Sequence, residues 1–245
     1  MDARLIIDEP ARGSWNMAVD EALLRASQDT GQIVLRLYQW FEPTLSLGYF
    51  QLSDERASHA PTRGLPVVRR STGGGAIVHD QELTYSLVHP IEDRFSDESQ
   101  SFVRRVHNAL IAVLRSMFAL DVRLCDKAVS KSPEPFQCFA RRSELDVLID
   151  HHKIAGSAQR RHRRAILQHG SILLAKSPHA EMLLGVNDLS RETIACKEVA
   201  GAFAQQVAAD FEFRLVDSQL RPAEAAAAAE IERERFTNLG WTDRR

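Results

Sequence analysis

Two residues in the middle of the chain have side chains that could form one reactive pair. Cys138 lies fifteen positions before Lys153. The thiolate is the nucleophilic form of cysteine, and a nearby cation lowers the pKa of the thiol. A cysteine beside a lysine could therefore accept an acyl group as a thioester and pass it on. The alternative is a small buried thiol, which is the commonest state of a free cysteine, and an unrelated surface amine.

The second feature is a cluster of three consecutive glycines in the sequence RRSTGGGAIVHD, residues 69–80. Because glycines weaken a strand, three in a row indicate a tight turn where backbone and ligand approach closely. Exposed N–H groups there could hold a carbonyl or phosphate oxygen, with Arg69 and Arg70 adding positive charge. The spacing matches neither a dinucleotide fingerprint nor a phosphate-binding P-loop. A plain glycine hairpin between two strands is the alternative.

A histidine and a basic run complete the candidate features. His169 and Gly170 lie inside the apolar run LQHGSILL, residues 167–174, which suits a core strand or the wall of a substrate tunnel. The basic run RRHRR, residues 160–164, lies between two expected strands. We expect a solvated loop there, and a docking patch for an acidic partner protein is the alternative.

The elements that must position these residues follow from hydrophobic spacing. We expect helices over residues 16–27, with Ser14 as the cap, over 99–120, and from about residue 190 to the end of the chain. We expect strands over residues 33–40, 66–70, 76–80, 83–88, 145–149, 153–158 and 166–174. The turn at 150–152 carries Asp and His, which tolerate left-handed backbone geometry. Strands in hairpin-like neighbours favour an α+β fold with antiparallel or mixed sheets, and no shift in composition divides residues 1–245 into more than one domain.

The overall composition excludes several classes of protein. With 44% hydrophobic and 26% charged residues, the chain is typical of an ordinary globular protein. A net charge of −2 predicts no general attraction to nucleic acid or to an anionic membrane. No CxxC pair is formed by the cysteines and no signal peptide is evident, so we expect the reducing cytoplasm. No metal-ligand spacing is found, because the adjacent pair His151 and His152 would point to opposite faces of a strand.

Five segments, in this order, resemble the lipoate–protein ligase and octanoyltransferase family, which shares a catalytic domain with the biotin–protein ligases. They are NMAVDEALL, LRLYQWFEPTLSLGYFQ, VVRRSTGGGAIVHDQELTYSLV, KIAGSAQRR and LQHGSILL. The resemblance implies a larger and a smaller mixed or antiparallel sheet flanked by helices. It also implies a tunnel for a medium-length acyl chain and attachment of the acyl group to a specific lysine of a lipoyl carrier domain.

The resemblance further implies roles for residues at matching positions. The arginine–glycine loop of the family covers the acyl or acyl-adenylate group, and the family's lysine corresponds to Lys153. We therefore expect Cys138 and Lys153 to be catalytic. The residues expected to bind substrate are Arg70, Gly73, Gly74, Gly75, His79, Gly156, His169 and Gly170.

The family divides by chemistry. Ligases activate free lipoate with ATP and need no cysteine, whereas transferases take octanoate from a carrier-protein thioester through an acyl-cysteine. The stretch QCFARRSELDVLIDHHKIAGSAQ places Cys138 at the nucleophile position of one transferase branch, and Cys196 lies too far beyond His169 for that of another. The resemblance thus favours an octanoyltransferase that uses octanoyl acyl carrier protein and a lipoyl carrier domain, with no cofactor or metal.

Three alternatives stay open at this point. The chain could be an ATP-dependent lipoate ligase, which would require ATP and Mg²⁺, or an amidotransferase that moves the acyl group between carrier domains. It could also be a non-catalytic acyl-binding module. Many single-chain bacterial ligases carry an accessory domain after the catalytic one, and the short C-terminus predicts that this chain has none.

Overall fold

The structure is a computed structural model that describes residues 1–91, 99–129 and 136–244. The strands are β1 (Asp2–Ile7), β2 (Ile33–Tyr38), β3 (Thr44–Leu47), β4 (Val67–Arg69), β5 (Ile77–His79), β6 (Glu82–Pro90), β7 (Val122–Leu124), β8 (Val147–Ile149), β9 (His152–His162), β10 (Ala165–Leu173) and β11 (Arg214–Ser218). The helices are α1 (Gly13–Thr30), α2 (Ser99–Phe118), α3 (Val186–Leu189), α4 (Cys196–Phe211), α5 (Pro222–Ile231) and α6 (Leu239–Thr242).

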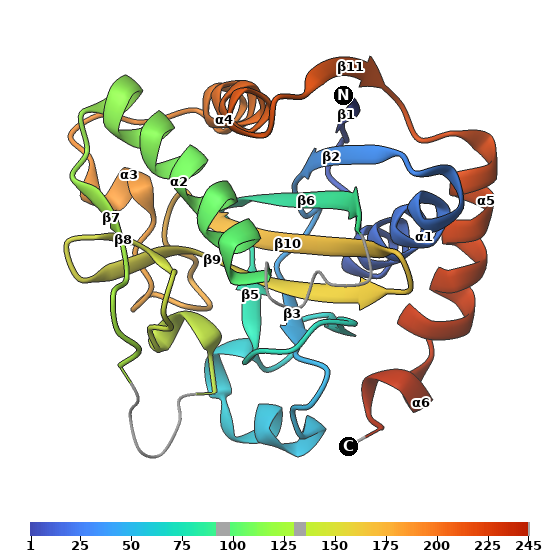
Figure 1. Ribbon diagram of the computed structural model, residues 1–245. Coiled ribbons are helices and arrows are strands. Elements are labelled where there is room, and N and C mark those ends of the chain that lie inside the picture. The colour runs from blue at the N-terminus through green and yellow to red at the C-terminus, as the bar shows by residue number, and fades with distance from the viewer. Residues whose placement is uncertain (92–98, 130–135, 245) are drawn as a thin grey trace.

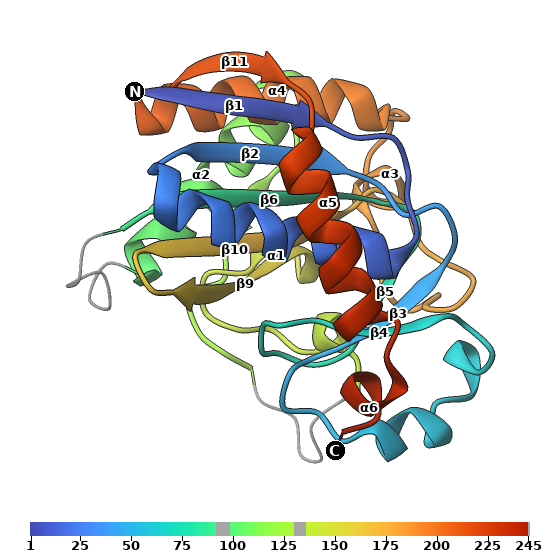
Figure 2. The ribbon, with the colours of Figure 1, turned by 90° about the vertical axis from the view of Figure 1, so that its right-hand side faces the viewer.

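These strands form two mixed sheets, one large and one small (Figures 1 and 2). The eight-stranded sheet has the order β11-β1-β2-β6-β10-β9-β8-β7, and the three-stranded sheet has the order β4-β3-β5. In the large sheet, β1 pairs with β2 and β11 in parallel, and the remaining neighbours are antiparallel. The predicted α+β fold with a larger and a smaller sheet flanked by helices is confirmed.

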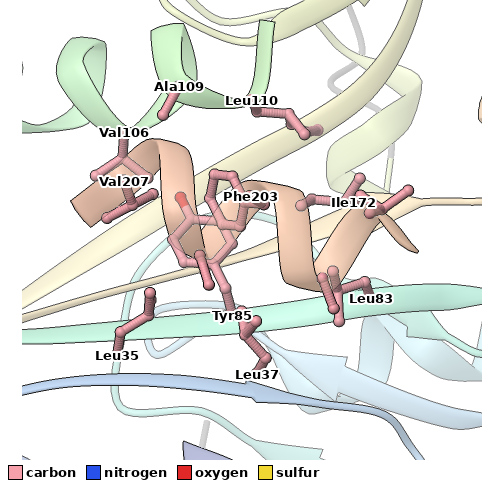
Figure 3. Packing of buried hydrophobic residues seen from close by; sticks show 14 of the residues in the cluster. Leu35, Leu37, Leu83, Tyr85, Val106, Ala109, Leu110, Ile172, Phe203 and Val207 are labelled. Carbon is pink, nitrogen blue, oxygen red and sulfur yellow. The ribbon is translucent and has the colours of Figure 1, made fainter. Parts of the chain in front are cut away.

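Helices α2 and α4 pack on one face of the large sheet, and α1 and α5 cover the other (Figures 1 and 2). Between α4 and the sheet, the ring of Phe203 meets the ring of Tyr85 on β6 edge-on, with 5.2 Å between centroids (Figure 3). Burying a large apolar side chain contributes about 1.5–3 kcal/mol, so this layer holds the helices against the strands. The predicted apolar face of α2 is buried from Phe102 to Val113. Met117, which follows Val113 at helical spacing, does not share that face and is 52% exposed in the last turn.

Several expectations about local structure were wrong. The basic run at 160–164 is a loop only at residues 163 and 164, because β9 continues to His162 by pairing with β10. Ser14 does not cap α1; its hydroxyl donates to Glu232 Oε1 at 2.6 Å instead. The C-terminal region is not helical throughout, since it contains β11, and strands β1, β3 and β7 had no clear pattern in the sequence.

The β8–β9 hairpin has the turn that the sequence predicts between its two strands. Asp150 adopts a left-handed backbone with φ of 52°. The turn brings Lys153, the second residue of β9, opposite Leu148 of β8. The residues just before β8 are thereby placed beside the start of β9.

In the described part of the chain, no helix is long and apolar enough to span a membrane.

Candidate active site

Cys138 begins a short 3-10 turn, Cys138–Ala140, that lies against the glycine loop. Its backbone N–H donates to the Ala76 carbonyl oxygen at 2.7 Å, and the Ala76 N–H donates to Phe136 O at 3.1 Å. A Cβ atom on Gly75 would lie 3.2 Å from both Cys138 N and Phe136 O. A glycine at position 75 therefore lets the two backbones approach, and the cysteine is fixed beside the loop.

Lys153 lies directly beside this cysteine. Its ammonium Nζ is 3.8 Å from Cys138 Sγ and 2.9 Å from Asp146 Oδ2. The lysine and aspartate side chains are only 3% and 7% exposed. The ammonium also lies 4.8 Å from the centroid of the Phe139 ring, a distance typical of a cation–π contact. The side chains of Cys138 and Lys153 therefore lie next to each other.

The surroundings of Cys138 favour its ionised form. Burial opposes ionisation and by itself raises the pKa of the thiol. The charges of Lys153 and Arg70, a hydrogen bond from the Gly75 N–H and the charge of Arg141 outweigh that effect. The net result is a Cys138 pKa below its ordinary value, so more of the nucleophilic thiolate is present at neutral pH.

Arg70 organises the glycine loop from within. Its guanidinium donates to the carbonyl oxygens of Gly73 at 2.9 Å and Gly75 at 2.7 Å, and to Ser46 O and Oγ. Burial lowers the pKa of Arg70 to about 10, which leaves it charged at neutral pH. Gly74 has a φ of +95°, a left-handed conformation that glycine adopts without strain. The loop is thus shaped by its own arginine, whose charge also acts on Cys138.

A cavity of about 360 Å³ opens beside the pair. Such a volume lies within the range of about 300–1,000 Å³ that small-molecule sites occupy. Of the residues predicted from the sequence, those that line it are Arg70, Gly73, Gly74, His79, Cys138, Lys153, Gly156, His169 and Gly170. Gly75 does not line the cavity, but it packs against the backbone of Phe136 and Cys138. The structure therefore brings all ten predicted residues together in one place.

Both histidines that the sequence predicts in the cavity are held in hydrogen-bonded networks. His79 Nδ1 lies 2.7 Å from the Glu82 carboxylate, its Nε2 lies 2.8 Å from Ser46 Oγ, and its ring stacks on Trp40 at 3.8 Å. Burial lowers the pKa of His79, which keeps the ring neutral at pH 7. These contacts fix the side chain of His79, which lies on β5 of the small sheet, in the wall of the cavity.

His169 connects the large sheet to the glycine loop. Its Nε2 lies 2.7 Å from Thr72 Oγ1, and its Nδ1 lies 3.2 Å from Asp20 Oδ2 on α1. Asp20 also accepts hydrogen bonds from Arg36, Tyr38 and Ser86. The loop, the β10 strand and helix α1 are therefore tied together by one buried polar network.

Sequence reasoning missed Asp146, Phe139 and Asp20. Asp146 is a charged residue just before an apolar strand, and Asp20 lies on the buried face of α1; both placements were visible signals of a buried ion pair. The other two cysteines do not line the cavity, and burial raises the pKa of Cys196. Among the described residues, no group of three or more His, Cys, Asp or Glu side chains could hold a metal ion.

Comparison with known proteins identifies the family. Residues 12–214 match the family model described as the lipoyl protein ligase A/B catalytic domain. The chain belongs to this family. The resemblance inferred from the sequence is thereby confirmed, and it agrees with the arrangement of the glycine loop and the lysine strand.

Two relatives are similar to this chain over nearly its whole length. Octanoyltransferase LipM of Brevibacillus brevis is 32% identical over 277 residues, which cover 99% of each chain. Octanoyltransferase LipM of Geobacillus kaustophilus is 31% identical over 263 residues, covering 95% of this chain and 94% of the relative. Both names agree with the transferase branch expected from the position of Cys138.

A solved structure from Thermoplasma acidophilum shares the fold. It is described as a bi-partite lipoate protein ligase and its E2 lipoyl domain, and it superposes with a TM-score of 0.81 over 99% of this chain and 96% of its own. Its sequence is 22% identical to this chain, so the likeness concerns the fold alone.

Proposed function

We propose that this chain is a protein octanoyltransferase that carries its acyl group on Cys138. The observation that carries this proposal is the 3.8 Å approach of Lys153 Nζ to Cys138 Sγ beside a cavity of about 360 Å³. The proposed donor is octanoyl acyl carrier protein, and the acceptor is a lysine of a lipoyl carrier domain. The names of the two relatives support the same reaction class.

In the first half of the reaction, the Cys138 thiolate attacks the carbonyl carbon of the donor thioester. A new carbon–sulfur bond forms, and the donor's carbon–sulfur bond breaks as the tetrahedral intermediate collapses. The donor leaves as a thiolate that takes up a proton. We assign stabilisation of the oxyanion to N–H donors near Gly73–Gly75 or to the Lys153 ammonium, which lies 3.8 Å from Cys138 Sγ.

In the second half, the acceptor amine attacks the acyl-cysteine. The carbon–nitrogen bond forms, the bond to Cys138 Sγ breaks, and the amine proton passes to the departing sulfur. Because Lys153 pairs with the buried Asp146 carboxylate, we assign its ammonium the role of stabilising the thiolate rather than of accepting this proton. Conversion of a thioester to an amide is downhill, so the reaction needs neither ATP nor a metal.

Intact-protein mass spectrometry tests the proposal. Wild-type protein is mixed with octanoyl carrier protein without ATP, alongside Cys138→Ser and, as a matched control, Cys196→Ser. We expect an octanoyl adduct that is labile to hydroxylamine on wild type and Cys196→Ser, and none on Cys138→Ser. If modification of the carrier domain instead requires ATP and free acid and survives Cys138→Ser, the chain is a ligase.

Two further properties belong to the proposal. Residues 1–245 are proposed to work as one catalytic domain, which is supported by the pairing of β1 with β11 across most of the chain length. The reducing cytoplasm is the proposed compartment, since the three cysteines carry no disulfide and Cys138 must remain a free thiol to react.

A further inference from the structure

A second cavity, of about 460 Å³, borders the active-site cavity. Phe139, Arg141 and Lys153 line both cavities. The second cavity lies among the 3-10 turn that begins with Cys138, the β8–β9 turn and the segment before α3. Its remaining lining residues are Val129, Ala140, Arg142, His151, His152, Met182, Leu183 and Leu184. The cysteine–lysine pair thus lies at the wall that the two cavities share.

The lining of this second cavity combines positive charge with apolar surface. It contains Arg141, Arg142 and Lys153, with two histidines beside them, and no Asp or Glu is among its described lining residues. The Arg142 side chain makes no hydrogen bond or ion pair with another described residue. Because the whole chain has a net charge of −2, this concentration of cations is local. It suits a ligand that carries an anionic group on an otherwise uncharged chain.

A thioester donor has two parts that extend from the reacting carbon in different directions. The acyl chain extends from the carbonyl carbon on one side, and the arm that carries the sulfur extends on the other. With the carbonyl at Cys138 and the acyl chain in the first cavity, the arm must be accommodated elsewhere. The second cavity begins at the same Lys153 and Phe139, so it lies where that arm must go.

We propose that the second cavity binds the phosphopantetheine arm of the acyl-carrier-protein donor, with its phosphodiester held by Arg142 and His152. The amide and alkyl part of the arm then lies against Leu183 and Met182. The inference rests on the proposed function, because it requires a thioester donor. Met182 is 89% exposed, so the cavity is open to solvent and an arm attached to a protein can enter it.

The charge of this cavity separates the donor from the acceptor. The acceptor brings a lysine side chain that is a cation in solution and loses one proton before its amine attacks, and the arginines of the second cavity repel a cation. The phosphodiester of the donor arm is attracted by the same arginines, and guanidinium groups form strong charge-assisted hydrogen bonds with phosphate oxygens. The cavity therefore fits the donor arm and disfavours the acceptor.

The test compares donors with and without the phosphate. Rates of Cys138 acylation are measured with octanoyl-pantetheine, octanoyl-phosphopantetheine, octanoyl-coenzyme A and octanoyl carrier protein. The proteins are wild type, Arg142→Gln, Arg142→Gln with His152→Gln, and the control Arg233→Gln. Arg233 is an exposed residue in the segment Glu232–Phe236 that follows α5. Helix α5 lies on the opposite side of the molecule from β8 (Figure 1).

We expect the phosphate to accelerate acylation of wild type, with octanoyl carrier protein the fastest donor. Losing the charge at Arg142 should slow the phosphorylated donors by about tenfold or more, as expected for a hydrogen bond to a charged group. Octanoyl-pantetheine should react equally with all variants, and Arg233→Gln should match wild type. This pattern would assign the phosphate to Arg142.

Three outcomes would overturn the inference. Equal slowing of donors with and without phosphate would mean that Arg142→Gln only disturbs the active site. If Arg142→Gln slows no donor, the phosphate binds elsewhere. If octanoyl-coenzyme A reacts as fast as octanoyl carrier protein, the cavity does not select an arm that is attached to a carrier protein. If no thioester acylates Cys138 of wild type, the proposed function itself fails, which is a distinguishable result.

Discussion

Gly156 provides the space that the Lys153 side chain occupies. A Cβ atom on Gly156 would lie 2.6 Å from Lys153 Cε and 2.9 Å from its Nζ. Contacts this short do not occur, so any larger residue at position 156 must displace the ammonium from its place between Asp146 and Cys138. The glycine of the KIAGSA motif is therefore required by the position of the lysine rather than by its own backbone.

Replacing this glycine should separate activity from folding. Gly156→Ala should slow Cys138 acylation by about a hundredfold, since a shift of about 1 Å in a reacting group has effects of that size. Its stability should fall by about 1–3 kcal/mol, as overpacking does in a close-packed interior. Single-turnover acylation and urea unfolding measure the two effects.

A second glycine provides the control for that experiment. Gly201 lies within helix α4, and a Cβ there would meet nothing within 4 Å. Gly201→Ala should leave acylation unchanged and raise stability by about 0.5–1 kcal/mol, because alanine is the better helix former. Equal acylation by Gly156→Ala and wild type would show that the position of Lys153 does not matter for the reaction.

The reactivity of Cys138 should extend to lower pH than that of an ordinary cysteine. Alkylation by iodoacetamide follows the thiolate, so the midpoint of its rate against pH should lie below the ordinary value of 9.0. Replacing the ion pair by apolar residues, Lys153→Met with Asp146→Leu, removes the lysine charge and should move this midpoint upward. Peptide mapping of the alkylated site separates Cys138 from the other two cysteines. An unchanged midpoint would exclude Lys153 as a cause of the lowered pKa.

The Asp146–Lys153 pair should also contribute to stability. Asp146→Asn leaves a buried ammonium without its carboxylate, and breaking a buried ion pair in this way costs about 3–5 kcal/mol. Asp150→Asn is the matched control, since Asp150 is exposed and asparagine tolerates its left-handed φ of 52°. Its unfolding free energy should stay within about 0.5 kcal/mol of wild type. Similar losses in both variants would argue against the pair.

The buried network around Asp20 should make the fold sensitive to acid. Burial raises the pKa of Asp20, but the hydrogen bond and charge of His169, the charge of Arg36 and the Ser86 hydroxyl hold it below 3.8. A carboxyl with a lowered folded-state pKa stabilises the fold above its unfolded pKa. That contribution is lost as the pH falls through the folded-state pKa.

Urea unfolding between pH 7 and pH 2 measures this dependence. Wild type should lose stability as the pH falls below about 4, where unfolded aspartate begins to bind protons. Asp20→Asn should be less stable at pH 7 and should show a shallower decline over the acid range. A decline as steep as that of wild type would assign the acid sensitivity to other carboxyl groups.

Much of the fold and of the site could be predicted from the sequence. The hydrophobic spacing of α2 and the apolar runs of β2, β6 and β10 follow from burial, and these strands are buried on both faces over most of their length rather than on alternate residues. Short edge strands were missed because β7, with three residues, and β11, partly exposed, carry no distinct pattern. The charge of the basic run at 160–164 predicts a solvated loop, whereas pairing with β10 makes most of it strand.

The order of the motifs in the sequence by itself determined the family, the glycine loop and the identity of the cysteine and the lysine. Only the tertiary structure decided that Cys138 and Lys153 meet, because their contact depends on the β8–β9 turn and on a bridge between Ala76 and Gln137. It also decided that Lys153 is paired with Asp146. Spacing along a chain constrains which residues can touch, whereas long-range packing determines which of them do. The electrostatic interaction between two side chains depends on the distance between them, which only that packing sets.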